Sequence, residues 1–256
     1  MKKVKRYVFL ALLCAPITLL STGCDALYQI ANSAGSQAND PSPLEIGNGL
    51  KEALNKGLTA AVGKLSATDG FWGDAAVKIL FPKEADFAAT KLRQIGAGKL
   101  VDDFEKLLNR AAEDAAKEAT SIFVNAITSM TFADVKNILF GGSTAATDYF
   151  KGKTSDALYN AFSPKIKGSL DKVGAAKAWT TITTTYNAIP LVNKKVETDI
   201  VRYATNKAMD GLFKKIADEE AQIRQNPVVR STALLKKVFG YADRKKASSG
   251  TKVTKG

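Results

Sequence analysis

The sequence KLVDDFEKLLNRAAEDAAKE, residues 99–118, decides the fold class. Its apolar side chains recur at intervals of three or four residues, which places them on one face of an α-helix. The members of this set are Leu100, Phe104, Leu107, Ala111 and Ala115. The same spacing occurs upstream at Leu50, Leu54, Leu58, Ala61 and Leu65. Because no β-hairpin or strand–helix–strand pattern accompanies these segments, we predict an all-α protein folded as a single multi-helix bundle domain.

Capping signals divide the middle of the chain into short helices. Thr131 has the pattern of an N-cap with Asp134 three positions on, and Gly141 follows the expected helix end at Phe140. Further helix starts are expected at Ser143 or Thr144, at Thr154 or Ser155, and at Pro164. The sequence therefore predicts several short helices between residues 131 and 171.

Two later stretches are predicted to be helical from their spacing. Residues 179–186 contain five threonines, which favour a strand, but Trp179, Ile182 and Tyr186 lie at helical intervals. The longest helix is expected to run from Val196 to about Arg224. Gly211 inside it costs about 1 kcal/mol relative to alanine. We therefore expect the helix to bend there, or another backbone to approach closely.

Residues 1–23 have the order of a signal peptide. Four cations precede an uncharged, largely apolar run of 14 residues, Tyr7–Leu20, and small residues follow. As a helix this run would be about 21 Å long, which is short of the ~30 Å hydrocarbon core of a bilayer. We therefore expect the segment to be removed rather than to remain in the membrane.

The sequence LSTGC, residues 20–24, resembles the bacterial lipobox, in which a peptidase cuts before a diacylglycerol-modified cysteine. Ser21 departs from the pattern, because a branched aliphatic residue is commonest there. We predict that Cys24 carries acyl chains such as palmitate and anchors a cell-envelope lipoprotein, with its domain in the periplasm. Ordinary cleavage that leaves a free thiol is the alternative. Two or more acyl chains, at ~0.8 kcal/mol per buried methylene, anchor a protein stably.

Composition divides the rest of the chain into three parts. Residues 24–42 follow the lipidated cysteine as a flexible tether, residues 43–240 form the helical domain, and residues 241–256 form a basic tail predicted to be disordered. The formal charge of +12 falls to +8 once the four cations of residues 1–23 are removed, and residues 120–256 carry +11. A basic half that faces a membrane would favour anionic lipid head groups, although surplus lysine also serves solubility.

The absence of histidine is the most informative feature of the composition. It excludes Ser-His-Asp and Cys-His catalysis, and it excludes histidine-ligated zinc, haem and non-haem iron. Cys14 lies in the leader and Cys24 is committed to lipid, so no disulfide or thiolate chemistry is expected. We therefore predict a non-enzymatic protein with no catalytic residue, no metal and no cofactor.

Phosphate-loop and carboxylate signals have simpler explanations. Gly152-Lys153-Thr154 ends like a Walker sequence, but Thr147 stands where the first glycine is needed. An anion site at residues 141–144 remains an alternative, since free N–H groups at a helix start attract negative groups. Glu105 lies in the first turns of a helix, where negative charge offsets the macrodipole. Arg110 and Glu113 are expected to form a surface ion pair.

A family resemblance is carried by Lys99–Val101, Asn109–Glu113, Met130–Thr131, Ala145–Phe150, Asp210–Phe213, Glu219–Glu220, Ile223–Arg224 and Leu234–Gly240. With these stretches, residues 50–240 resemble the bacterial family of domain of unknown function 4197. It implies a helical, exported and often lipid-anchored protein, and it implies no activity. If the family shares a site, the candidate binding residues are Asn109, Arg110 and Glu113, followed by Glu220 and Arg224.

Two functions compete at this point. The favoured one is a non-enzymatic envelope module, anchored to the membrane through Cys24, that binds a protein, an anionic envelope component or membrane lipid. The alternative is a carrier of a lipid or other apolar small molecule in a helical-bundle pocket. A pocket lined by phenylalanines and open at one end would favour the carrier, whereas a filled core with an exposed apolar patch would favour the module. No nucleic-acid partner is expected.

Aromatic residues on the apolar faces are expected to pack in the core. They are Phe71, Trp72, Phe87, Phe104, Phe123, Phe150, Phe162, Trp179 and Phe213. A hydrolase working through carboxylates is a third function. It would need two acidic side chains converging in a cleft at separations of ~5–9.5 Å.

Overall fold

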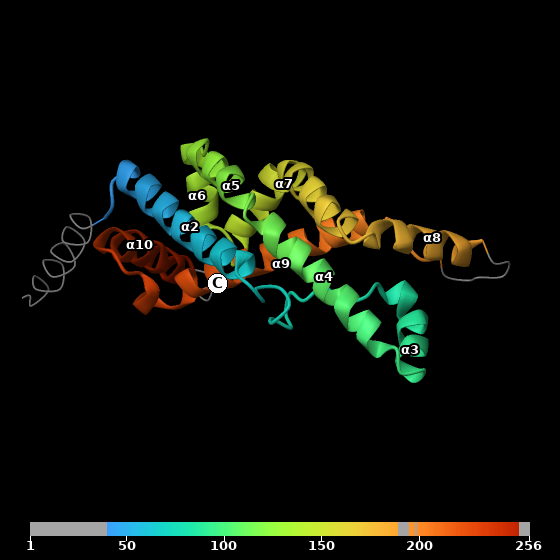
Figure 1. Cartoon of the computed structure of the whole chain (residues 1–256). Coiled ribbons are helices and arrows are strands. Elements are labelled where there is room, and N and C mark those ends of the chain that lie inside the picture. Colours follow the sequence, from blue (N-terminus) through green and yellow to red (C-terminus); the bar gives the residue numbers. More distant parts are fainter. Residues whose placement is uncertain (1–39, 189–194, 198, 251–256) are drawn as a thin grey trace, which may run out of the picture. The chain divides into compact units, whose positions relative to one another are not determined.

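The computed structural model describes residues 40–188, 195–197 and 199–250, and within these ranges every regular element is a helix (Figure 1). In chain order the elements are α2 (Pro43–Ser66), η1 (Lys83–Ala85), α3 (Asp86–Gln94), α4 (Gly98–Ala116), α5 (Ala119–Thr128), α6 (Phe132–Phe140), α7 (Ala145–Asp171), α8 (Ala175–Asn187), α9 (Ile200–Gln225), η2 (Pro227–Val229) and α10 (Ala233–Gly250). The predicted all-α bundle is confirmed. The predicted leader, Cys24, most of the tether and residues 251–256 lie outside the described residues.

The folded unit begins at Pro41, and its first helix, α2, starts at Pro43. Ser42 caps α2: its hydroxyl accepts from the Glu45 N–H at 3.2 Å, and its own N–H donates to the Glu45 carboxylate at 2.8 Å. The apolar face of α2 packs on α9 and α10. At Gly49 a Cβ would lie 2.7 Å from Val238 Cγ2, so a side chain there would displace α10.

The apolar face predicted for α4 is only partly the buried one. Ala111 and Ala115 are buried as expected, but Leu100 is 63% exposed and Phe104 and Leu107 are half-buried. The interior instead receives Val101, Leu108, Ala112, Ala116 and three polar residues, Glu105, Asn109 and Glu113. The reason is tertiary: the helix-free stretch between α2 and η1 lies against α4 and needs polar partners there.

A single helix, α7, replaces the short helices predicted after Thr144. Thr154 and Ser155 do not cap new helices, because their hydroxyls donate to the carbonyl oxygens of Phe150 and Lys151, four residues back, at 2.6 and 2.7 Å. Pro164 lies inside the helix, whose buried face continues on both sides of it. The Walker-like residues 152–154 are therefore helix interior and form no phosphate loop.

Residues 179–186 are helical as predicted, within α8, but α9 starts later than expected. Asp199 caps α9, so Val196 precedes the helix. The backbone N–H and C=O groups of Val196 form two hydrogen bonds with the Asn187 side chain, each at 2.8 Å. Gly211 lies inside α9, and a Cβ at this position would lie only 2.7 Å from Phe71 Cε1. The close neighbour is thus an aromatic side chain, not a second backbone.

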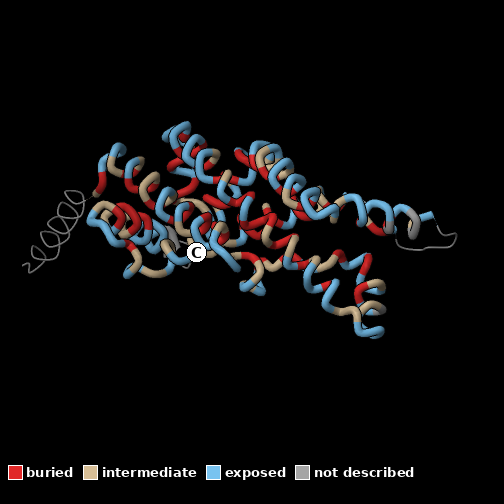
Figure 2. Tube along the Cα trace, in the orientation of Figure 1, coloured by how far each residue is buried: buried red, intermediate tan, exposed pale blue. Residues whose placement is uncertain are grey.

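The predicted disordered tail is wrong for its first part, because α10 continues to Gly250. Composition suggested disorder, yet Ala242 is 4% exposed, the ring of Tyr241 packs on Phe140, and Asp243 pairs with buried Arg230 at 2.7 Å. Tertiary contacts thus hold a segment that is polar by count. Figure 2 shows buried residues gathered where α2, α4, α7 and α9 meet, whereas α8 is mostly exposed.

Candidate functional site: an apolar pocket between α3, α4 and α8

Glu113 and Arg110 hold the turn that follows α2. One Glu113 oxygen accepts from the backbone N–H groups of Phe71 and Trp72, each at 3.2 Å, and the other accepts from Arg110 at 2.5 Å. The second Arg110 nitrogen donates to Asp69 at 2.7 Å. Hydrogen bonding to Glu113 raises the pKa of Arg110. The expected surface ion pair is therefore present, but its carboxylate is buried and also satisfies backbone.

Asn109 and Glu105 continue the same face of α4 at four-residue intervals. The Asn109 amide accepts from the Ile79 N–H at 2.8 Å and donates to the Ile79 carbonyl at 2.7 Å. Glu105 accepts from the Phe81 N–H at 3.0 Å. Backbone groups outside helices need such partners once they are buried. Glu105 thus has a tertiary role beyond offsetting the helix dipole, and Asn109 is a structural tie.

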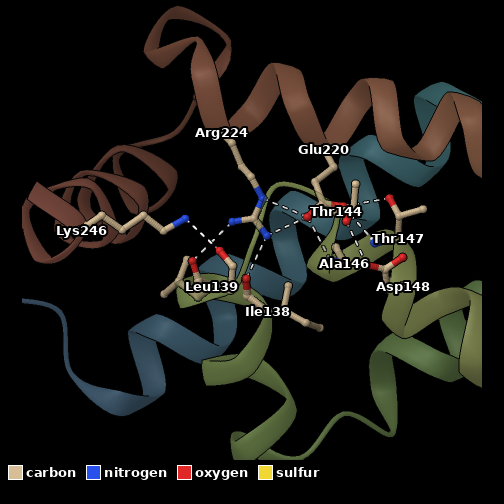
Figure 3. Close-up of polar contacts among 10 residues, drawn as sticks. Ile138, Leu139, Thr144, Ala146, Thr147, Asp148, Glu220, Arg224 and Lys246 are labelled. Carbon is tan, nitrogen blue, oxygen red and sulfur yellow. Dashed lines mark hydrogen bonds and ion pairs between the residues drawn. The ribbon is translucent and has the colours of Figure 1, made fainter. Parts of the chain in front are cut away.

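Glu220 occupies the start of α7, where the sequence left room for an external anion. Its carboxylate accepts from the backbone N–H groups of Ala146 and Thr147, both at 2.9 Å, and from the Thr147 hydroxyl at 2.8 Å (Figure 3). The free N–H groups do attract a negative group. That group belongs to the chain itself, so the N–H groups of Ala146 and Thr147 are already occupied.

Arg224 donates to carbonyl oxygens at the end of α6, the helix that precedes α7. It donates to Glu220 at 2.7 and 2.9 Å and to the carbonyl oxygen of Ile138 at 2.8 Å, with a longer bond to Leu139 (Figure 3). The side chains of Glu220 and Arg224 are only 6% and 12% exposed. The pair therefore joins the end of α6 to the start of α7, and the five candidate binding residues form two structural clusters.

A different part of the chain is hollow. An apolar cavity of about 460 Å³ lies between α3, α4 and α8. It is lined by Phe81, Ala85, Phe87, Ala88, Leu92, Leu100, Val101, Phe104, Ala175, Ala178, Trp179, Thr183 and Val196. Its volume falls in the range of ligand pockets, about 300–1,000 Å³. We refer to this cavity as the apolar pocket.

Three aromatic rings in the wall of the apolar pocket pack on one another. Phe104 stacks on Trp179 with ring centroids 5.4 Å apart, and Phe81 meets both rings edge-on at 5.6 and 5.2 Å. The polar atoms of the wall are already satisfied: the Trp179 indole donates to the Glu197 carbonyl, and the Thr183 hydroxyl to the Trp179 carbonyl, both at 2.8 Å. The pocket therefore presents hydrocarbon to an occupant.

The apolar pocket is open because its two sides are held by different neighbours. α3 packs mainly on α4 and η1, whereas α8 packs on α7 and α9. Figure 1 shows α3 and α8 reaching beyond the packed helices. Phe87 is 47% exposed and Leu100 is 63% exposed, although both line the pocket. Large apolar side chains that a monomer leaves exposed around a hollow are typical of a binding site.

Sequence reasoning placed Phe87, Phe104 and Trp179 in the core, and only Trp179 is fully buried there. It did not single out Phe81. A usable signal was present in residues 81–100, where apolar side chains are frequent next to a short helix that has few partners to bury them. Within the described ranges no group of three or more acidic, histidine or cysteine side chains could hold a metal ion.

In the same residues no helix has the length and apolar character needed to cross a bilayer. A family described as protein of unknown function (DUF4197) matches residues 40–240. No curated protein and no solved structure matches the chain. Since the matched region covers more than half of the sequence, the chain belongs to the DUF4197 family of proteins of unknown function.

Proposed function

We propose that this chain is a lipid-anchored, non-enzymatic lipoprotein of the cell envelope whose helical domain carries the hydrocarbon part of a lipid or other apolar small molecule. The observation that carries the proposal is the apolar pocket, which is open and lined by Phe81, Phe87, Phe104 and Trp179. Of the two functions that the sequence leaves in competition, this geometry favours the carrier.

The energetics of such an occupant are those of hydrocarbon burial. Each buried methylene contributes about 0.8 kcal/mol, so a chain that buries ten methylenes gains about 8 kcal/mol before the cost of its ordering. The satisfied wall atoms add no penalty, because no polar group loses a partner when hydrocarbon replaces water. The pocket therefore selects for apolar length rather than for a particular polar group.

The anchor follows from the lipobox-like sequence that ends at Cys24. Mass spectrometry of the protein purified from its own envelope should find an amino-terminal cysteine carrying acyl chains. An intact Met1, or an unacylated sulfur on Cys24, would refute the anchor and leave the pocket proposal to be judged by itself.

The pocket proposal is tested by filling the pocket. Ala178 lines it with an exposed side chain, so the Ala178→Phe variant places a ring in the cavity without disturbing buried packing. The full-length protein in phospholipid nanodiscs would be labelled with a photoactivatable diazirine analogue of hexadecanol. We expect labelled peptides from α3, α4 and α8, and a loss of about tenfold or more in the variant, equivalent to 1.4 kcal/mol.

The matched control is Ala133→Phe, an exposed alanine of α6 far from the pocket in the sequence and absent from its lining. This control should label like the unmodified protein. Equal labelling of the two phenylalanine variants, or labelling confined to other helices, would overturn the proposal.

A further inference from the structure

A second hollow shares a wall with the apolar pocket. It has a volume of about 520 Å³ and is lined by Lys78, Leu80, Phe81, Lys83, Glu84, Asp86, Ala89, Thr90, Arg93, Glu105, Tyr203 and Lys207. We refer to it as the polar hollow. Phe81 lines both cavities, and the two faces of α3 divide between them: Ala88 and Leu92 line the apolar pocket, Ala89 and Arg93 the polar hollow.

The charged side chains of the polar hollow differ in how strongly they already interact with other groups of the protein. Lys78 lies over the Trp72 ring, with its nitrogen 3.5 Å from the ring centroid, and Arg93 pairs with Asp102 at 2.7 Å. The Glu105 carboxylate is occupied by the Phe81 N–H. These groups have limited capacity to bind a charged ligand.

Two cations of the polar hollow remain available. Lys207 approaches its carboxylate partner, Asp210, only to 3.7 Å, the geometry of a weak surface pair. Lys83 is exposed, and in the described part of the chain no ion pair joins it to a carboxylate. An anion in the hollow would therefore meet Lys83 and Lys207 without having to displace a strong internal partner. Their attraction would have to exceed the repulsion from the carboxylates of Glu84 and Asp86, which line the same hollow.

We propose that the two cavities together bind one single-chain amphiphile with an anionic head group. Its hydrocarbon chain lies in the apolar pocket and its head group lies in the polar hollow against Lys83 and Lys207. The inference rests on the proposed function, because the chain occupies the same pocket. The inference adds a preference for an anionic head group, which the apolar pocket alone does not provide.

The test compares probes that share a chain and differ in the head group. Full-length protein in nanodiscs would be labelled with diazirine analogues of hexadecanoate, hexadecyl phosphate and hexadecanol, at a pH where both acids are ionised. The variant is the double change Lys83→Gln and Lys207→Gln. For each probe the yield on α3, α4 and α8 is divided by that of the unmodified protein, which cancels differences in partitioning into the bilayer.

The double variant should lose labelling by at least one anionic probe by about fivefold or more, as expected when a charged hydrogen bond is removed, and should keep its labelling by hexadecanol. The anionic probe with the larger loss distinguishes a carboxylate-headed from a phosphate-headed ligand. The matched control, Lys136→Gln with Lys153→Gln, removes two exposed charges of α6 and α7 and should leave all yields unchanged.

Failure of this inference and failure of the proposed function give different results. If all probes label the pocket but none depends on Lys83 and Lys207, the anionic head group is wrong and the hydrocarbon site stands. An equal loss for hexadecanol also overturns the inference, since it shows a structural effect of the two changes. If no probe labels α3, α4 or α8, the proposed function itself is wrong.

Discussion

The domain has a packed body, where α2, α4, α7 and α9 meet, and an open end, where α3 and α8 border the cavities. These two regions use their side chains in opposite ways. In the body, Phe123, Phe150 and Phe162 are fully buried, and the void between α2, α7 and α9 holds about 30 Å³, room for about one water. At the open end, two cavities of about 460 and 520 Å³ border α3, and Phe87 and Leu100 remain exposed. In the first region the apolar side chains are packed in the core, whereas in the second some of them stay at the surface around the cavities.

This difference changes the meaning of the family resemblance. The five polar residues singled out by the resemblance all lie in structural clusters, where they pair with backbone groups or with each other. Residues that look like a binding site in a sequence can thus be the residues that hold helices in place. The apolar pocket is instead lined mainly by apolar residues, and the polar hollow by basic and acidic side chains.

The largest effect should come from the Glu220→Ala variant. It leaves Arg224 buried without a carboxylate and removes the acceptor for three donors at the start of α7, so we expect a loss of about 3–5 kcal/mol in the free energy of unfolding. Urea denaturation measures it. The adjacent Glu219→Ala is the control, because Glu219 forms an exposed pair with Lys64 and should cost under ~1 kcal/mol. Similar losses in the free energy of unfolding for both variants would show that Glu220 does not hold the helices of the body together.

The Asn109→Leu variant tests the boundary between the two regions. It keeps the number and branching of the side-chain heavy atoms but leaves the N–H and C=O groups of Ile79 unpaired, which should cost about 2–4 kcal/mol. Amide hydrogen exchange should show the loss of protection first in residues 71–81. Asn125→Ala, at an exposed position of α5, should change neither quantity. Uniform loss of protection over the whole body would argue against a local tie.

Two glycines of the body should respond to alanine with opposite signs. At Gly211 the new Cβ would lie 2.7 Å from Phe71 Cε1, so overpacking should cost about 1–3 kcal/mol. At Gly57, on the rim of the small void, the nearest atom is 3.5 Å away, so Gly57→Ala should stabilise α2 by about 0.5–1 kcal/mol. Thermal unfolding of both variants checks this. Destabilisation by both would mean that the body is tighter at Gly57 than its contacts indicate.

The smallest effect concerns pH at the exposed start of α2. The hydrogen bond from Lys237 lowers the pKa of Glu45 from 4.5 to about 2, with help from the Ser42 N–H. A lowered carboxyl pKa adds stability that is complete above the unfolded pKa and is lost as the pH falls toward 2. NMR titration of the Glu45 carboxyl should show this pKa rising in the Lys237→Gln variant. An unchanged pKa would assign the shift to the capping box alone.

Local signals predicted the fold well. The Thr131–Asp134 capping box and the helix end at Phe140 are both present, because each depends only on neighbouring residues. The continuity of α7 was missed because hydroxyls that can cap a helix start can also donate to carbonyls four residues back. A choice between those two roles is made by the buried face of the helix and cannot be made locally.

The site was less predictable than the fold. Glu220 and Asn109 were identified as notable, but their partners lie 74 and 30 residues away, and sequence spacing carries no information on such pairs. The apolar pocket exists because α3 and α8 pack on different neighbours, which is a property of the tertiary arrangement. From the sequence we could predict only that an open pocket lined by phenylalanines, if present, would favour a carrier.

The most direct test of the central claim is a crystal structure of the protein with 1-bromohexadecane, located through the anomalous scattering of bromine. The claim is that the open end binds hydrocarbon while the body is filled. It predicts a bromine peak among Phe81, Phe104, Ala178 and Trp179, between α3, α4 and α8. A peak among the helices of the body, or no peak in the apolar pocket, would contradict it.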